Sequence, residues 1–281
     1  MTKTEVLEQL VAMSRRLGAP ERDLVLLGEG NTSARAGDDT FFVKASGTEL
    51  ATANRDVFVE VRFDGVLPML EGGDLCDDEI IRRLMAARAD PGAARRPSVE
   101  TVLHAHLLRL EGVTFVGHTH PTSVLALLCA KGGRQAISGR LFPDEIVCCG
   151  VAPAYVEFTD PGIPLARATR DAVQAYIAGH GFRPKALLLE NHGLFALGAT
   201  PSEVEAITLM WDKVARVLAG TGAFGGPRYL GARTVDRIFT RPDEKYRERE
   251  ICRPETGPAP TASSSGGATL SEAKGRDRGG D

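Results

Sequence analysis

The stretch VTFVGHTHP, residues 113–121, decides how this chain folds. Its β-branched and aromatic residues are typical of a buried strand, and Pro121 ends that strand because proline cannot continue a hydrogen-bonded ladder. Alternate side chains of a strand leave the same face, so His118 and His120 point one way while Thr119 points the other. The sequence therefore predicts a pair of imidazoles at the rim of a sheet.

A second apolar run ends in a similar way. The segment ALLLE, residues 186–190, has the composition of a buried strand and is followed by the turn Asn191, His192 and Gly193. Two strands ending at one rim would bring three neutral imidazoles together, which suits Zn²⁺ with an open position for water or substrate. An HxH pair alone is equally compatible with a structural role, and the third histidine favours a metal site.

Outward from these runs, the hydrophobic period alternates between that of helices and that of strands. Helical spacing covers residues 6–17, 77–85, 99–110, 123–130, 165–178 and 201–218. Strand-like runs are FFVK at 41–44, VFVEVRF at 57–63, VTFVGH at 113–118, EIVCCG at 145–150, ALLLE at 186–190 and GLFALG at 193–198. The alternation predicts one α/β domain over residues 1–250, with helices on both faces of a central sheet.

Composition and charge exclude several classes of function. A hydrophobic content of 43% is ordinary for a globular protein, and a net charge of -3 argues against nucleic-acid or anionic-membrane partners. The first 18 residues interleave charged with apolar side chains, which predicts neither a signal peptide nor a spanning helix. We expect a cytoplasmic enzyme with a small-molecule substrate, and a disordered Gly/Ser/Pro-rich tail over residues 251–281.

A carboxylate and a further histidine lie on one predicted helix. Glu100 opens this helix, where the helix dipole alone favours a carboxylate; alternatively it points at the metal as a resting ligand and a base. His104 follows four residues later on the same face, where it can hydrogen-bond or pack. His106 points away from His104, so we do not expect these two to share a ligand.

Two turns rich in Gly and Ser, residues 28–33 and 46–48, have the composition of an anion-binding nest or of plain hairpin turns. Neither has the spacing GxGxxG or GxxxxGK[ST], which excludes a dinucleotide or nucleoside-triphosphate loop. Lys44 adds positive charge to such a nest, or is an exposed lysine of an edge strand.

Five motifs occur in a fixed order: GEGNTSAR, KASGTEL, PSVETVLHAH, VGHTHP and LLLENHG. Together they resemble the class II aldolase/adducin family, closest to rhamnulose-1-phosphate and fuculose-1-phosphate type aldolases, over most of the chain. The resemblance implies a three-layer α/β/α sandwich around a central, mainly antiparallel sheet. It also implies a homotetramer with active sites between subunits.

The resemblance implies roles for individual residues. It makes Glu100 the catalytic acid/base, and it places Zn²⁺, or alternatively Fe²⁺, Mn²⁺ or Co²⁺, on His118, His120 and His192. The substrate phosphate would be held at Gly30, Asn31, Ser46, Gly47 and Ser98.

This chain departs from the family's pattern at two positions. Val99 stands where the family commonly has a second serine, which removes one phosphate donor. Phe142 stands where the fuculose enzymes have a proton-donating tyrosine, which leaves Tyr246 as the candidate donor.

The predicted function is that of a carbon–carbon lyase. A zinc-dependent aldolase would cleave a ketose 1-phosphate reversibly into dihydroxyacetone phosphate and an aldehyde. One alternative is a related dehydratase, epimerase, decarboxylase or Fe(II) oxygenase on the same site. The other is a non-catalytic interaction module like the adducin head, which lacks the ligand set; the three histidines argue against it.

Overall fold

A seven-stranded sheet lies at the centre of this mixed α/β protein, whose computed structural model describes residues 1–73 and 75–253. The strands lie in the order β3-β2-β1-β4-β7-β6-β5, and neighbours are antiparallel except β5 and β6, which are parallel. Their bounds are Asn31–Arg35 (β1), Thr40–Lys44 (β2), Phe58–Arg62 (β3), Phe115–Thr119 (β4), Ala154–Val156 (β5), Ala186–Leu189 (β6) and Gly193–Gly198 (β7).

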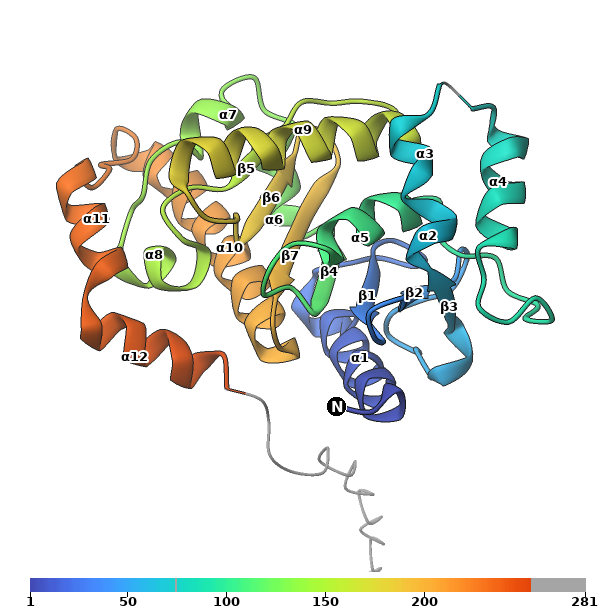
Figure 1. Ribbon diagram of the computed structural model, residues 1–281. Coiled ribbons are helices and arrows are strands. Elements are labelled where there is room, and N and C mark those ends of the chain that lie inside the picture. The colour runs from blue at the N-terminus through green and yellow to red at the C-terminus, as the bar shows by residue number, and fades with distance from the viewer. Residues whose placement is uncertain (74, 254–281) are drawn as a thin grey trace, which may run out of the picture.

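Helices cover both faces of the sheet (Figure 1). Successive residues of β4 enter different cores, with Phe115 in one and Val116 in the other. The Phe115 side packs against α1 (Lys3–Leu17), α6 (Thr122–Leu128) and α10 (Pro201–Thr221). The Val116 side packs against α2 (Phe63–Val66), α3 (Pro68–Glu71), α4 (Asp77–Ala86), α5 (Thr101–Leu108) and α9 (Ile163–His180).

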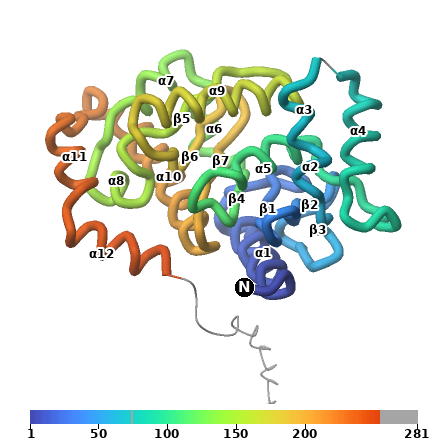
Figure 2. The backbone as a smooth tube through the Cα atoms, viewed as in Figure 1, coloured from blue at the N-terminus to red at the C-terminus, as the bar shows by residue number. Residues whose placement is uncertain are grey.

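The C-terminal helices form a smaller unit at one side. Figure 2 shows α11 (Ala232–Thr240) and α12 (Pro242–Ile251) beside α8 (Pro143–Cys149). Ile146 of α8 and Ile238 of α11 belong to a separate small apolar cluster. The remaining short elements are α7 (Gly133–Ala136) and three turns of 3₁₀ helix, Pro20–Arg22 (η1), Arg55–Val57 (η2) and Gly222–Phe224 (η3).

Most of the elements predicted from periodicity are present, and one has the wrong type. The run EIVCCG, predicted as a strand, lies in helix α8. Pro143 occupies its first turn together with acidic side chains, and Gly150 ends it at φ 81, so the ends carry helix signals that outweigh the strand-like centre. Strands β1 and β5 were not predicted; residues 31–33 of β1 were expected in a Gly/Ser-rich turn because Asn and Ser are typical of turns.

Two other predictions concern the C-terminal tail and membrane-spanning helices. Helix α12 extends to Ile251, and residues 254–281 of the predicted tail lie outside the described residues. Among the described residues, no helix combines the length and the apolar character needed to span a bilayer.

Gly117 in β4 allows two helices to approach the central sheet closely. A Cβ at this position would lie 2.6 Å from Val204 Cγ1 of α10 and 3.1 Å from Leu17 Cδ1 of α1. Glycine is thus required by packing at this point, because both helices are held against the strand by a shared core.

We expect Gly117→Ala to lower the free energy of unfolding by roughly 1–3 kcal/mol, the usual cost of overpacking a core. Equilibrium unfolding in urea measures this change. The control is Gly220→Ala in the last turn of α10, where an added Cβ meets nothing within 4 Å. Its stability should be unchanged or higher, since alanine favours helix. A Gly117→Ala protein as stable as the parent would contradict the close packing.

Candidate metal centre

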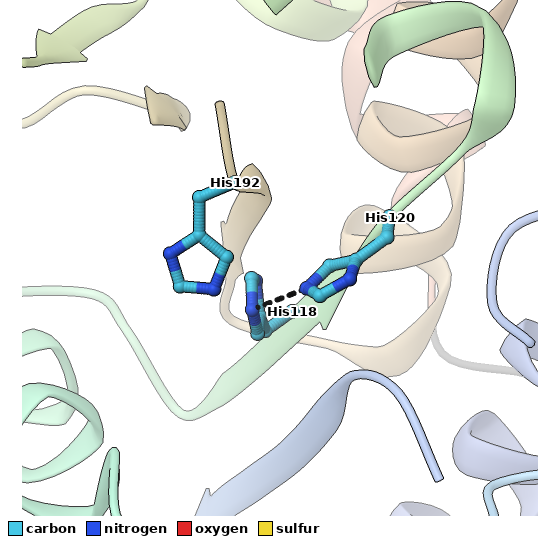
Figure 3. Close-up of side chains that lie close together, drawn as sticks. All are labelled: His118, His120 and His192. Atoms are coloured by element: carbon cyan, nitrogen blue, oxygen red, sulfur yellow. Dashed lines mark hydrogen bonds between the residues drawn. The ribbon is translucent and has the colours of Figure 1, made fainter. Parts of the chain in front are cut away.

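Three imidazoles converge at one rim of the sheet (Figure 3). His118 lies in β4, His120 just beyond its end, and His192 in the turn between β6 and β7. One nitrogen of each ring lies within 4.8 Å of the others, and the Nε2 atoms of His118 and His120 are 2.9 Å apart. The structure thus brings together the three histidines that the sequence singled out.

The strand register and nearby backbone groups position these rings. His118 pairs with Asn31 of β1 on one side and with Phe195 of β7 on the other. Its ring stacks on Phe195 at a centroid distance of 4.0 Å, and Nδ1 lies 3.1 Å from the carbonyl oxygen of Leu194. Nδ1–H therefore donates to that carbonyl, which leaves the Nε2 lone pair facing the other histidines.

The turn that carries His192 depends on two residues with small or polar side chains. Asn191 has φ 51, in the left-handed region that asparagine tolerates better than most residues. A Cβ on Gly193 would lie 2.7 Å from both His120 Cδ2 and the carbonyl oxygen of Thr119. Only glycine allows β7 to begin this close to the end of β4.

The Glu100 carboxylate closes the site from the side of α5. It occupies the N-cap position, yet its side chain makes no capping hydrogen bond. Instead Oε1 lies 3.3 Å from His192 Nε2 and Oε2 lies 3.6 Å from His118 Nε2. Helix-dipole stabilisation alone therefore does not account for its orientation.

Electrostatics of the site follow from burial. Burial lowers the pKa of His118, His120 and His192, which keeps the imidazoles in the neutral form that ligates metals. Burial also raises the pKa of Glu100, against the opposing effects of His192, a hydrogen bond from Asn31, and Lys44. Desolvation, which favours the neutral acid, is thus opposed by neighbours that favour the ionised carboxylate.

The donor set fits a divalent transition metal. The Glu100 Oε1 atom is buried and has no hydrogen-bond partner, although it faces His192. Three neutral nitrogens that converge, with a carboxylate beside two of them, match the ligands that zinc and iron take in proteins. A cation at this point would satisfy both the orphaned oxygen and the facing nitrogen lone pairs.

A polar cavity of about 270 Å³ opens beside the histidines. This volume is below the ~300–1,000 Å³ of typical pockets for drug-sized ligands and suits a smaller molecule. Val99, 41% exposed, contributes an apolar part of the wall. All five residues predicted to hold phosphate line it: Gly30, Asn31, Ser46, Gly47 and Ser98.

Not every predicted phosphate ligand is free to donate. Asn31 Nδ2 donates to Glu100 Oε2 at 2.6 Å and to Ser98 Oγ at 3.4 Å, so its amide hydrogens are already used. Ser98 Oγ also accepts from the backbone N–H of Glu100 at 3.3 Å. Ser98 Oγ accepts in both contacts, so its own O–H stays available to donate, together with Gly30 and the turn that contains Ser46 and Gly47.

Other predicted or overlooked residues lie as follows. Tyr246, on α12, is 63% exposed and does not line this cavity, so its role as proton donor stays a prediction. His104 and His106 do not join the histidine cluster found among the described residues. Glu29, in the GEGN turn, was not predicted as a site residue. Its Oε2 atom lies 3.9 Å from His120 Nδ1.

The family is shown by a match over most of the chain. Residues 8–219 match the family described as the class II aldolase and adducin N-terminal domain. The chain belongs to the class II aldolase and adducin family. This membership places the histidine cluster and Glu100 in a superfamily that includes aldolases and dehydratases.

Two curated relatives are similar to this family member in sequence. Methylthioribulose-1-phosphate dehydratase of Sorangium cellulosum (strain So ce56) is 28% identical over 226 residues, which cover 74% of this chain and 91% of that protein. The uncharacterized oxidoreductase YuxG of Bacillus subtilis (strain 168) is 29% identical over 201 residues, 69% of this chain. The match spans only 26% of YuxG's length.

A solved structure shares the fold. The L-fuculose 1-phosphate aldolase from Glaciozyma antarctica PI12 superposes with a TM-score of 0.60 at 18% identity, covering 88% of this chain and 86% of that one. At this identity the similarity concerns the arrangement of the backbone. It supports the architecture described above for the aldolase-family domain.

Lys44 supplies a buried positive charge to the cavity. Its Nζ donates to the carbonyl oxygens of Gly28 and Thr48, and burial lowers its pKa to about 8, opposed by Glu100 and Glu49. Below this pKa the ammonium form attracts an anion, and above it the neutral amine does not.

We therefore expect inorganic phosphate to lose roughly tenfold in affinity between pH 7 and pH 9 through Lys44, since about nine-tenths of this lysine is neutral at pH 9. Calorimetric titrations of the parent and of Lys44→Met at both pH values isolate this effect, because the ionisation of phosphate itself is common to both. Lys131→Met removes an exposed lysine outside the cavity and should behave as the parent. Identical pH dependence in the parent and Lys44→Met would refute the assignment.

Proposed function

We propose that this chain is a metal-dependent aldolase, a carbon–carbon lyase of carbohydrate metabolism. It would cleave a ketose 1-phosphate reversibly into dihydroxyacetone phosphate and an aldehyde. The observation that carries the proposal is a buried carboxylate, Glu100, set against three convergent imidazoles in the wall of a small polar cavity. Family membership and the ordered motifs support it.

In this proposal His118, His120 and His192 hold the metal, for which Zn²⁺ is preferred and Fe²⁺, Mn²⁺ or Co²⁺ are alternatives. When bound, a divalent ion stabilises negative charge on the substrate's oxygens as a Lewis acid, so no Schiff-base lysine is needed. The phosphate is held by the Gly30, Ser46 and Gly47 backbone and side chains, with Lys44 behind them. Asn31 and Ser98 support Glu100 from the same wall.

The chain's own acid/base step falls to Glu100. In the cleavage direction, the bond between the donor carbon and the aldehyde carbon breaks, and its electron pair stays with the donor fragment. The hydroxyl proton of the departing aldehyde passes to a base, and the group predicted for this transfer is Tyr246. A proton is then returned to the donor carbon by Glu100, whose burial raises its pKa and so suits it to proton transfer near neutrality.

A dehydratase is the second candidate, favoured by one specific observation. The relative whose length is almost fully matched, 91% of it, is a methylthioribulose-1-phosphate dehydratase. Removal of water from a ketose 1-phosphate begins with loss of a proton from the carbon next to the carbonyl, and Glu100 accepts it where, in aldol cleavage, it returns a proton to the donor carbon. The two candidates therefore use one acid/base residue and differ in the bonds that break: carbon–carbon in the aldolase, C–H and C–O in the dehydratase.

The proposal includes a homotetramer in the cytoplasm, as the family resemblance implies. Leu26 and Leu27 are 67% and 73% exposed and directly precede the GEGN turn at the cavity. Exposed large apolar side chains of this kind often lie in contacts between subunits. The substrate would be a small sugar phosphate, without nucleic-acid or membrane partners.

A substrate panel tests the reaction directly. Protein stripped of metal and reloaded with Zn²⁺, Fe²⁺ or Mn²⁺ is offered ketose 1-phosphates and their unphosphorylated counterparts. We expect dihydroxyacetone phosphate, measured by coupled reduction, from at least one ketose 1-phosphate, and none from the stripped protein. Loss of water without carbon–carbon cleavage would replace the aldolase by the dehydratase. If neither product forms from any substrate, both candidates fail.

The variant Glu100→Gln tests the role of the carboxylate. It should retain bound metal, because the three imidazoles remain, but should lose exchange of the donor C–H with solvent by about 10²–10⁴-fold, the usual contribution of a general base. Exchange is followed by proton NMR of dihydroxyacetone phosphate in D₂O, and metal content by elemental analysis. The matched control, Glu157→Gln, changes an exposed carboxylate paired with Arg134 and should leave exchange unaltered. Full exchange in Glu100→Gln would exclude it as the base.

A further inference from the structure

His104 is fully buried beneath the site, and neither the metal nor the phosphate uses it. It lies on α5, four residues after Glu100, and contacts β1 through both ring nitrogens. Nδ1 is 2.6 Å from Ser33 Oγ, and Nε2 contacts Asn31 Oδ1 within hydrogen-bond distance. Asn31 and Ser33 are alternate residues of β1, so both face α5.

These contacts form an unbroken line of hydrogen bonds from Ser33 to the Glu100 carboxylate. The line runs from Ser33 through His104 to Asn31, and Asn31 Nδ2 reaches Glu100 Oε2 at 2.6 Å. All four side chains are buried. Each polar group therefore needs a partner among its buried neighbours, because an unpaired buried polar group costs free energy. Asn31 Nδ2 has a second acceptor outside the line, Ser98 Oγ at 3.4 Å.

When Glu100 is ionised, the donor and the acceptor of every hydrogen bond in this line are determined. A carboxylate accepts hydrogen bonds and donates none, so the Asn31 amide must present its NH₂ to Glu100 and its oxygen to His104. His104 must then carry its proton on Nε2, and Nδ1 accepts from the Ser33 hydroxyl. The opposite tautomer would turn the amide round and place two oxygen acceptors 2.6 Å apart.

The ring itself remains neutral under ordinary conditions. Burial lowers the pKa of His104 to about 3. Its protonation state is thus constant over the physiological range, and only the choice of tautomer is open. The Ser33 hydroxyl, which is buried with it, can donate to Nδ1 or accept from it, so the ionised Glu100 sets the choice through Asn31 and Ser33 completes it.

We propose that His104 is a positioning residue: its Nε2–H tautomer fixes the orientation of the Asn31 amide, and Asn31 in turn holds Glu100 aimed at the histidine cluster. The catalytic part of this inference rests on the proposed function of Glu100. A purely structural His104 would only fill space against Phe195, whose ring centroid is 5.4 Å away. A residue of similar volume would then serve as well, whether or not it donated a hydrogen bond to Asn31.

Two isosteric amides separate these roles. In His104→Gln the amide nitrogen reaches the place of Nε2 and can still donate to Asn31, whereas in His104→Asn it reaches only the place of Nδ1. We expect His104→Gln to keep kcat within a few-fold of the parent. His104→Asn should lose kcat for donor C–H exchange by about tenfold or more through loss of the oriented hydrogen bond, with KM and metal content unchanged. Equal kcat in the two variants would overturn the proposal.

Folding and orientation are checked without substrate. Urea unfolding of both variants shows whether each folds, and Ser33→Ala, which removes only the far hydroxyl, provides a milder third variant that should lower kcat in the same direction. In ¹⁵N NMR of ring-labelled protein, the His104 signal, assigned by its absence in His104→Gln, should show a protonated Nε2 and a bare Nδ1 from pH 5 to pH 9.

These experiments distinguish a failure of the His104 inference from a failure of the proposed function of Glu100. A protonated Nδ1 in the NMR spectrum overturns the inference whatever the enzyme does. If instead the tautomer is as expected but the parent shows no exchange with any ketose 1-phosphate or dihydroxyacetone phosphate, the proposed function of Glu100 fails, while the orientation of Asn31 by His104 stands.

Discussion

The pairing of β4 between β1 and β7 is the constraint on which the site depends. In this register Asn31 lies opposite His118, and His118 lies opposite Phe195. A slip of one residue would turn His118 to the other face, away from α5 and its carboxylate. The close approaches at Gly117 and Gly193 restrict the same strand from both sides, since neither position has room for a Cβ.

The main electrostatic cost of this arrangement is the burial of Glu100. A buried carboxylate is unfavourable unless charges and hydrogen bonds compensate for it. Asn31 supplies a hydrogen bond, while His192 and Lys44 supply favourable potential. One oxygen remains without a hydrogen bond and faces His192, so the compensation is incomplete at the point where the proposed cation would lie.

Composition predicted the two strands at whose ends the histidines lie, because each is a short apolar run followed by a turn residue. It failed for EIVCCG, where β-branched and thiol side chains outweighed Pro143 and Gly150 at the ends. The meeting of His118, His120 and His192 was predictable from two strand ends. The contacts of Asn31 with Glu100 and His104 were not, because they depend on how α5 crosses β1, which no local pattern specifies.

In the proposed function, the two ends of the cavity bind different parts of the substrate. This difference explains which part of the substrate the motifs specify. Lys44 and the turn at Gly47 form the end suited to phosphate, and Glu100 with the histidines forms the end suited to a carbonyl and its acidic C–H. A ketose 1-phosphate spans both ends through its first carbons, whether the next step is aldol cleavage or loss of water. In this proposal the five motifs define the donor half of the substrate, and residues around its other half would determine which bond breaks.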